Sequence, residues 1–514
     1  MASSAQIIGA SVLFTLYAIF VLYFVVKGAR GTKNISDYAV GSFTFSPYYV
    51  ALSLAAAMTS AATFVINPGL IATYGLSAYI SYGLVFPLAS LTSLVILSKS
   101  FRKFGQSVKA LTLSSWVGSK YQSKGYALFI AILTVLLLTF IVLILVALVK
   151  VIAQALNANQ IAVLAVVVAF TFGYMMFGGA NSMVYTNVIQ ASLMILVALI
   201  LIGSGFQFFR DGFFGFFEKL KIIDPQLVKF PNEPSPLFRD FFEIVVAQLV
   251  VGAAVVCQPH IITKSLLLKK ESDVNKFLTT TVIVQFLFFS VVFVGLYARL
   301  LFPDLTLNGG HINVDSVISN YVITVFSGGI GSLLVGLLVI LGLISAGFST
   351  IEGLIQSLST TITTDIIKPL FGKSIKNETN YITINRLVIA AMAIVAFLMS
   401  REQIINPNVS VAIFAQNGTY SYFSILFVPL VFGIFLKNVQ MKSALSGSLT
   451  ALVVYFTVYY LLPYLYKSGI ASFGFANRYF NDQVQNPGIA AAVAILSALL
   501  VGLCVHFFSR KKEA

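Results

Sequence analysis

Long apolar runs follow one another along the whole chain, and short polar segments, many of them basic, separate them. The run YALFIAILTVLLLTFIVLILVALV, residues 126–149, contains no charged residue and does not alternate apolar with polar positions. About 20 apolar residues, rising roughly 1.5 Å each, cross the hydrocarbon core of a bilayer as one helix. Lipid admits only helices and closed barrels, and barrel strands would alternate. The pattern therefore predicts an all-α polytopic membrane protein.

The apolar windows predict about 13 membrane-spanning helices in a single transmembrane domain that covers residues 1–514. The windows lie at 5–26, 45–73, 77–98, 126–155, 159–178, 182–208, 240–266, 277–301, 319–364, 381–400, 408–436, 442–465 and 487–508. The ninth window is too long for one crossing. We therefore expect a short helix ahead of a true span at 333–364.

The segments between these windows are unequally charged. If the N-terminus lies outside, the cytoplasmic side carries about 22 of the 32 lysines and arginines, including those of KSLLLKKESDVNK, DIIKPLFGKSIK and the tail SRKKEA. Positive charge gathers on the cytoplasmic side, so we expect an outside N-terminus and a cytoplasmic C-terminus in the cell membrane. The first window has no basic segment before it and is expected to be a retained span rather than a cleaved signal.

Composition narrows the class of function. The chain is 58% hydrophobic and 10% charged, and loops rather than a basic arm carry its net charge of +15, which excludes a nucleic-acid partner. The cysteines and histidines lack metal or catalytic spacing, so we expect no enzyme and ordinary polar roles for the histidines near membrane surfaces. Neither the continuous polar pore of a channel nor the output domain of a sensor is evident in the sequence, and nothing indicates an obligatory protein partner.

Two of the windows are interrupted. The second contains MTSAATFVINPG, residues 58–69, where polar residues, a proline and a glycine break an apolar run. The seventh contains Gly252 and Pro259. A broken helix frees backbone carbonyls, which in lipid must line a cavity or bind a partner such as a cation, so paired interruptions indicate a transporter site. Close helix packing through small residues is the alternative.

The ninth window carries an unusual density of polar residues. Ser345, Ser349 and Glu352 lie on one helical face, and the adjacent hydroxyls of Ser349 and Thr350 offer hard oxygens that suit an alkali cation. Hydroxyls can instead bond back to their own helix. An ionisable Glu352 within a span must face a cavity, pair with a cation or be protonated.

Two further polar segments lie near the beginnings of expected spans. FGGANSMVYTNVIQ, residues 177–190, places Asn187 and Gln190 one turn apart in the sixth span. AQNGTYSY, residues 415–422, places Gln416 and Tyr420 below the outer surface. These side chains either join neighbouring helices or contact a polar solute.

Five segments in the same order resemble the sodium:solute symporter family, which contains sodium/proline, pantothenate, monocarboxylate and sugar carriers. They are SAATFVINPGLIATYGLSAY, LTLSSWVGSKY, FGGANSMVYTNVIQ, QPHIITKSLLLKKESD and SAGFSTIEGLIQSLSTTITTDIIK. The resemblance covers about residues 35–440 and implies a leucine-transporter-type fold with a five-plus-five inverted-repeat core. The repeats would span 45–208 and 240–436, flanked by an additional N-terminal helix at 5–26 and additional C-terminal helices at 442–508.

The resemblance also implies residue roles. A sodium ion, the implied cofactor, would bind between the second and ninth spans, with Ala56, Thr59 and Ala346 offering carbonyls and Ser349 and Thr350 offering hydroxyls. The solute would contact Ser60, Thr63, Phe64, Asn67, Phe140, Val251, Val255, Gln416 and Tyr420. Asn187 stands where the family often has an acidic residue, and Glu352 stands where it usually has a small hydroxyl residue. Either the carboxylate has moved to Glu352, or Glu352 carries a proton; both residues are expected to serve coupling.

The sequence therefore predicts sodium-coupled symport of a small organic solute by alternating access. The positive end of the half-helix after the break favours an anionic group, which indicates an amino acid such as proline or a short monocarboxylate. A proton-coupled carrier that uses Glu352 and a sugar-type substrate are the alternatives among carriers. Outside that class, an ion channel is the alternative.

Overall fold

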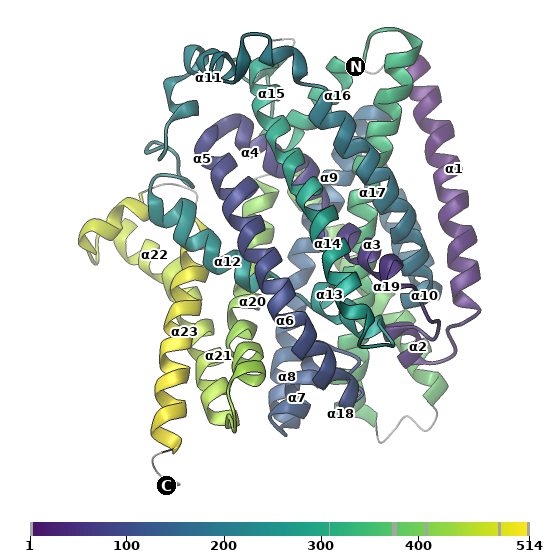
Figure 1. The fold of residues 1–514 in the computed structure, drawn as a ribbon, viewed down its shortest axis with the longest axis vertical. Coiled ribbons are helices and arrows are strands. Elements are labelled where there is room, and N and C mark those ends of the chain that lie inside the picture. Colours follow the sequence, from purple (N-terminus) through teal and green to yellow (C-terminus); the bar gives the residue numbers. More distant parts are fainter. Residues whose placement is uncertain (1–3, 308, 373–377, 407–409, 482–484, 511–514) are drawn as a thin grey trace.

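A computed structural model describes residues 4–307, 309–372, 378–406, 410–481 and 485–510. These residues are helical almost throughout, as the absence of apolar–polar alternation predicted, and they form a bundle whose long helices run along one axis (Figure 1). The one described pair of strands, β1 (Thr306–Leu307) and β2 (Gly310–His311), is a short antiparallel ladder in a connection.

The first half of the chain ends with the longest helix. Its elements are α1 (Ser4–Ala29), α2 (Ile35–Val40), α3 (Pro47–Met58), η1 (Ala62–Ile66), α4 (Asn67–Tyr74), α5 (Leu76–Tyr79), η2 (Ile80–Val85), α6 (Phe86–Ser107), α7 (Leu113–Lys120), α8 (Lys124–Leu133), η3 (Thr134–Leu137), α9 (Leu138–Leu156) and α10 (Gln160–Gly203).

The second half begins with an irregular segment and returns to long helices. Its elements are η4 (Phe206–Phe209), α11 (Gly212–Ile223), η5 (Pro225–Val228), η6 (Phe242–Val246), α12 (Ala247–Val255), α13 (Pro259–Ile262), η7 (Thr263–Leu267), α14 (Asp273–Ser290), η8 (Val291–Phe293), α15 (Val294–Leu301), η9 (Val314–Ser316), α16 (Val317–Val325), α17 (Gly329–Thr361), η10 (Ile362–Ile367), α18 (Lys368–Phe371), α19 (Glu378–Ile405), α20 (Val411–Phe435), α21 (Met441–Phe456), η12 (Thr457–Leu461), α22 (Leu462–Lys467), η13 (Gly474–Tyr479) and α23 (Pro487–Arg510).

Ten helices of the described residues are long and apolar enough to cross a membrane, and twelve if two bent pairs each count as one span. The protein is therefore a multi-pass membrane protein, while the expected number of 13 spans stays a prediction. One of the counted helices, α10, has 44 residues. At roughly 1.5 Å per residue, it is about twice as long as the hydrocarbon core is thick.

Gly179 divides α10. Its φ of 67° and ψ of −167° lie outside the helical region, and a Cβ there would stand 3.0 Å from the Cα of Tyr38 on α2. Only glycine adopts this backbone conformation at little cost and leaves room for α2. The fifth and sixth expected spans are therefore joined by a kink rather than by a loop.

The ends of the molecule agree with an odd number of crossings. In Figure 1, α1 begins at the upper end and α23 runs down to the lower end, and α7, α8 and α18 lie at that lower end. The orientation with the lower end in the cytoplasm stays a prediction. Residues 373–377 and 511–514, which contribute to the basic segments named above, lie outside the described residues.

Two spans are bent within the bundle. The first consists of α3 and the segment Ala62–Tyr74, which meet at 54°, and the second consists of Phe242–Val255 and Pro259–Leu267, which meet at 57°. Pro259 is the first residue of α13, and Gln258 before it is extended, because a residue before proline avoids the helical region. α3 packs against α10, α14 and α17, while α13 packs against α3 and α17. Both breaks therefore lie beside α17.

Candidate functional site

The helical ladder of α3 ends within the segment that the sequence marks as interrupted. Its last backbone bond runs from Thr59 N to Ala55 O at 3.1 Å, and Thr59 is extended, with φ −99° and ψ 95°. The chain becomes helical again at Ala62 in a single π turn, η1. Pro68 one turn later has no N–H to donate to an earlier carbonyl, which favours this irregular start. The carbonyl of Thr59 accepts no hydrogen bond from any residue that the structure describes.

The hydroxyl face of α17 lies directly against this break. Ser349 Oγ donates to Ala56 O at 2.8 Å and lies 3.1 Å from Ala346 O, while Thr350 Oγ1 donates to Ala346 O at 3.2 Å. Ala56, Ser349 and Ala346 are fully buried. Four of the five groups expected to bind sodium thus form one chain of short contacts between α3 and α17. The fifth, Thr59, caps α3 beside them and is itself fully buried.

Gln285 of α14 holds the break from the opposite side. Its Nε2 donates to Ala55 O at 3.0 Å, and its Oε1 accepts the Thr59 hydroxyl at 2.7 Å. One amide therefore ties the last turn of α3 to the first extended residue. Because the Thr59 side chain is engaged by Gln285, its carbonyl is the free oxygen at this position.

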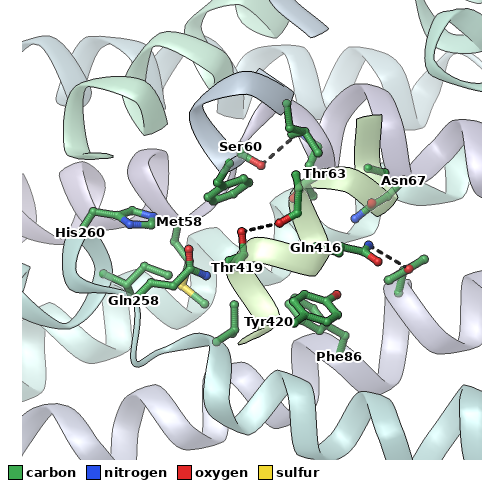
Figure 2. Close-up of a pocket in the computed structure, with 18 of the residues that line it drawn as sticks. Met58, Ser60, Thr63, Asn67, Phe86, Gln258, His260, Gln416, Thr419 and Tyr420 are labelled. Carbon is green, nitrogen blue, oxygen red and sulfur yellow. Dashed lines mark hydrogen bonds between the residues drawn. The ribbon is translucent and has the colours of Figure 1, made fainter. Parts of the chain in front are cut away.

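A cavity with a volume of ≈ 100 Å³ lies on the other side of the break (Figure 2). Of the residues expected to contact a solute, seven line it: Ser60, Thr63, Asn67, Phe140, Val255, Gln416 and Tyr420. The other two lie elsewhere. Phe64 is fully buried against Phe288, with ring centroids 5.7 Å apart, and Val251 is fully buried in the core.

The cavity combines an apolar wall with uncharged polar groups. Its further lining includes Met58, Tyr82, Phe86, Phe289 and Thr419. Gln416 Nε2 donates to Tyr82 Oη at 3.2 Å, and Ser60 Oγ accepts from Ala62 N at 3.1 Å. No aspartate, glutamate, lysine or arginine is among the described residues that line it.

Two side chains at the second break complete the lining. Gln258 and His260 are each 2% exposed, and Gln258 Oε1 and His260 Nδ1 have no hydrogen-bond partner within the described residues. Figure 2 shows both side chains beside Met58 at one end of the cavity. Buried polar atoms without partners carry a free-energy cost of roughly 1–3 kcal/mol each, so these atoms indicate where a ligand or water binds. The expectation that His260 lies near a membrane surface is wrong, because the second break turns it inward.

Glu352 lies one turn beyond Ser349 on α17 and is fully buried. Its Oε1 accepts from Tyr174 Oη at 2.6 Å and from Gln190 Nε2 at 3.1 Å, while its Oε2 accepts from Thr186 Oγ1 at 2.6 Å. All three donors belong to α10. The carboxyl group therefore fastens α17 to the kinked helix.

Asn187 is the fifth member of this network. With its amide nitrogen directed toward Gln190 and Glu352, the nitrogen lies 2.9 Å from Gln190 Oε1 and 3.1 Å from Glu352 Oε2. In the same orientation its oxygen lies 3.1 Å from Ser53 Oγ on α3. This orientation gives every donor an acceptor, and it is the one that we adopt. The two residues expected to serve coupling are thus in contact, and they connect α3, α10 and α17.

Comparison with known proteins identifies relatives of this arrangement. Residues 38–451 match the family described as the sodium:solute symporter family. The sodium/pantothenate symporter of Escherichia coli is 26% identical over 447 residues, which cover 84% of this chain and 86% of that protein. The sodium/proline symporter of Staphylococcus aureus is 24% identical over 464 residues, which cover 88% and 86%.

Solved structures show the same fold. A Na⁺-coupled sialic acid symporter, solved in a substrate-bound outward-open state, superposes with a TM-score of 0.74 at 16% identity over 96% of each chain. A transporter of the nucleobase-cation-symport-1 family, solved in a closed conformation with bromovinylhydantoin bound, gives a TM-score of 0.52 at 12% identity over 92% of this chain and 95% of that one. The expected leucine-transporter-type architecture is confirmed.

Proposed function

This chain belongs to the sodium:solute symporter family, and on that premise we propose that it moves a small carboxylated solute, an amino acid or a short monocarboxylate, together with sodium across the cell membrane. The relatives are transporters, and we propose that this chain likewise carries its solute by alternating access and catalyses no covalent reaction. Sodium is the coupling ion.

The sodium site that we propose consists of the carbonyl oxygens of Ala56, Thr59 and Ala346 and the hydroxyl oxygens of Ser349 and Thr350. The single observation that carries this assignment is the 2.8 Å contact between Ser349 Oγ and Ala56 O across the broken helix. Carbonyl and hydroxyl oxygens are hard ligands, and an ion between them would replace the partners that the break removes. The Thr59 carbonyl, which has no described partner, would complete the set.

The same ion would favour a solute that carries a carboxylate. The described lining of the cavity offers no basic side chain, so a carboxylate would be balanced by the bound sodium and by the positive end of the half-helix that starts at Ala62. The relatives' solutes, proline and pantothenate, both have a carboxylate. The cavity volume of ≈ 100 Å³ is small beside the roughly 300–1,000 Å³ of pockets for drug-sized ligands, which favours a proline-sized solute.

The rest of the solute would meet the polar and aromatic groups of the cavity. Gln258 Oε1 accepts a hydrogen bond, and His260 Nδ1 donates or accepts one according to its tautomer. An amino or hydroxyl group on the solute would satisfy the first of these atoms. We therefore propose that the solute carries at least one hydrogen-bond donor in addition to its carboxylate.

For an amino acid, which is a zwitterion without net charge, one sodium ion provides enough energy for useful accumulation. Moving one charge through 100 mV yields about 2.3 kcal/mol, which corresponds to a roughly 50-fold gradient of a neutral solute.

The N-terminus is proposed to lie outside and the C-terminus in the cytoplasm. All groups of the two proposed binding sites come from one chain, so we propose that no obligatory protein partner is needed.

Uptake into proteoliposomes tests this proposal. Purified protein is reconstituted, and an inward sodium gradient is imposed with radiolabelled L-proline, pantothenate, lactate or glucose outside. We expect accumulation of one of the carboxylated solutes, and its loss when sodium is replaced by choline. Accumulation of glucose, or accumulation driven by a proton gradient without sodium, would contradict the proposal, as would a sodium current through the protein that needs no solute.

A further inference from the structure

One buried charge in this part of the molecule has no role in the proposed sites. Lys264 belongs to η7, at the end of the second bent span, and only 3% of it is exposed. Its Nζ donates to Ser53 Oγ at 2.7 Å. The sequence pattern assigns this lysine to a basic cytoplasmic loop, but the second break instead directs it into the bundle. An ammonium group removed from water in this way needs an opposite charge close by.

Glu352 is that charge, and Asn187 connects the two. The oxygen of Asn187 lies 3.2 Å from Lys264 Nζ, and its nitrogen lies 3.1 Å from Glu352 Oε2. An amide can accept from an ammonium and donate to a carboxylate at once, whereas an aspartate here would place two carboxylates side by side. Asn187 therefore has the chemistry that a bridge between these two charges requires.

Three other ionisable groups lie around this pair. Tyr174 of α10 donates to Glu352, and Tyr17 of α1 accepts from Gln190 at 2.8 Å. His260 lies one turn before Lys264 on the same bent span. Among the groups that the structure describes, Glu352 is the acidic one whose charge acts on Lys264.

The pair stands directly beside the proposed sodium site. Ser53, which holds the ammonium, and Ala56, which faces Ser349, lie three residues apart on α3, a rise of about 4.5 Å. Ser349 and Glu352 have the same spacing on α17. Where α3 packs against α17, the proposed sodium position and the position of the Lys264 ammonium thus lie about one helical turn apart.

We infer that Lys264 is a tethered cation which occupies a second cation position and limits the carrier to one exchangeable sodium ion. This inference rests on the proposed sodium site. With Lys264 in place, its charge and that of Glu352 cancel, and the neighbouring sodium binds in a neutral surrounding. Without the ammonium, the hydroxyl of Ser53, the oxygen of Asn187 and the carboxylate of Glu352 would offer a sodium ion a set of hard oxygens.

Equilibrium binding of ²²Na⁺ to the purified protein tests the inference without a solute. The wild type is expected to bind about one ion with a Hill coefficient of about 1. Lys264→Met removes the charge but keeps an unbranched chain, and it is expected to bind a second ion, with a Hill coefficient above 1. Glu352→Gln leaves the ammonium unbalanced and is expected to weaken ²²Na⁺ binding by at least about tenfold. A merely structural pair would not shift sodium binding in opposite directions.

Two further variants provide controls. Lys269→Met removes an exposed lysine from the loop that follows η7, and it is expected to bind sodium as the wild type does. The double variant Lys264→Met/Glu352→Gln has no buried charge and is expected to return to one ion of near wild-type affinity. It also keeps the inference testable if Lys264→Met alone does not fold.

The outcomes separate the inference from the proposed function. If the wild type binds no ²²Na⁺, the proposed sodium site fails. If the wild type binds one ion and Lys264→Met binds the same single ion with the same affinity, the inference alone is overturned. Loss of sodium binding in the folded double variant would overturn it as well.

Discussion

The two broken helices differ in what they present to the centre of the molecule. At the first break, between α3 and η1, the chain presents backbone carbonyls. The Ser349 hydroxyl donates to one of them, Ala56 O, while the Thr350 hydroxyl beside it donates to Ala346 O within α17. At the second break, between α12 and α13, it presents the side chains of Gln258, His260 and Lys264. The bends are similar, 54° and 57°. Similar bends therefore present the carbonyls of the proposed sodium site in one place and a row of directed side chains in the other.

The difference follows from the residues that form each break. The first consists of small residues and ends before Pro68, so few side chains screen its carbonyls. The second has Pro259 at the start of the new helix, and the residues before and after this proline are large and polar. α17 touches both, because Gly353 lies against the second break, where an added Cβ would stand 3.3 Å from His260 Cβ. The cation and the solute would thus act on the same helix from two sides, as coupling requires.

The largest effect is expected from the hydroxyl pair at the first break. Ser349→Ala combined with Thr350→Ala removes two of the five proposed ligands. Loss of an outer partner alone costs roughly 10–100-fold in metal affinity, so the sodium concentration for half-maximal uptake should rise by at least about 100-fold. The measurement is sodium-dependent uptake in proteoliposomes. The matched control is Thr361→Ala on the same helix, whose hydroxyl bonds its own backbone at 2.8 Å; an equal shift in both would show that the effect is not local.

A smaller effect is expected from the amide that supports the first break. Gln285→Leu removes the two hydrogen bonds that hold Ala55 and Thr59, but it removes no ligand of the proposed sodium site. The sodium concentration for half-maximal uptake should therefore rise by roughly 10-fold. Thr281→Val on the same helix is the control, because its hydroxyl bonds Phe277 O at 2.8 Å. An unchanged sodium requirement in Gln285→Leu would mean that the break keeps its shape without this support.

At the second break the effect should fall on the solute instead. Gln258→Leu removes an acceptor that faces the cavity, and a single hydrogen bond contributes about 0.5–1.5 kcal/mol, so KM for the solute should rise by about 2- to 13-fold. The sodium requirement should stay within about twofold of the wild type. A change in sodium requirement with an unchanged KM would remove the distinction between the two breaks.

The smallest effect is expected where α17 meets the second break. Gly353→Ala would place the new Cβ 3.3 Å from His260 Cβ and 3.7 Å from Ala57 Cβ. Because the first contact is tight, α17 and α13 must separate by a few tenths of an ångström. We expect KM and the sodium requirement to rise together by about two- to threefold, measured in the same uptake assay. A change confined to one of the two would indicate that α17 does not link the breaks.

The sequence predicted those parts of the site that depend on chemical type and local order. The break near Met58 was predictable because polar residues and Pro68 interrupt an apolar run. The stripe on α17 was predictable because Ser349, Thr350 and Glu352 have helical spacing. The structure brings nearly all of the residues that were expected at the sodium and coupling sites close together. The roles of these residues stay proposals.

The remaining parts of the site depend on the directions in which side chains point, and the spacing of residues along the sequence does not determine these directions. Phe64 lies in a π turn, whose irregular rotation turns the ring toward Phe288 rather than into the cavity. Lys264 belongs to a basic segment that reads as a loop, and only the bend after Val255 brings it inside. His260 is one turn from it, and the same bend buries it. A warning signal was present, since QPH lies at the interruption of the seventh apolar window.

Direct measurement of bound sodium tests the central assignment. Purified wild-type protein, the Ser349→Ala/Thr350→Ala variant and the Thr361→Ala control are compared by ²²Na⁺ binding at equal protein concentration and equal ionic strength. We predict saturable binding in the wild type and in Thr361→Ala, and no saturable binding in the double variant over the same range of sodium concentration. Wild-type binding in the double variant would place the ion elsewhere and contradict the proposed site.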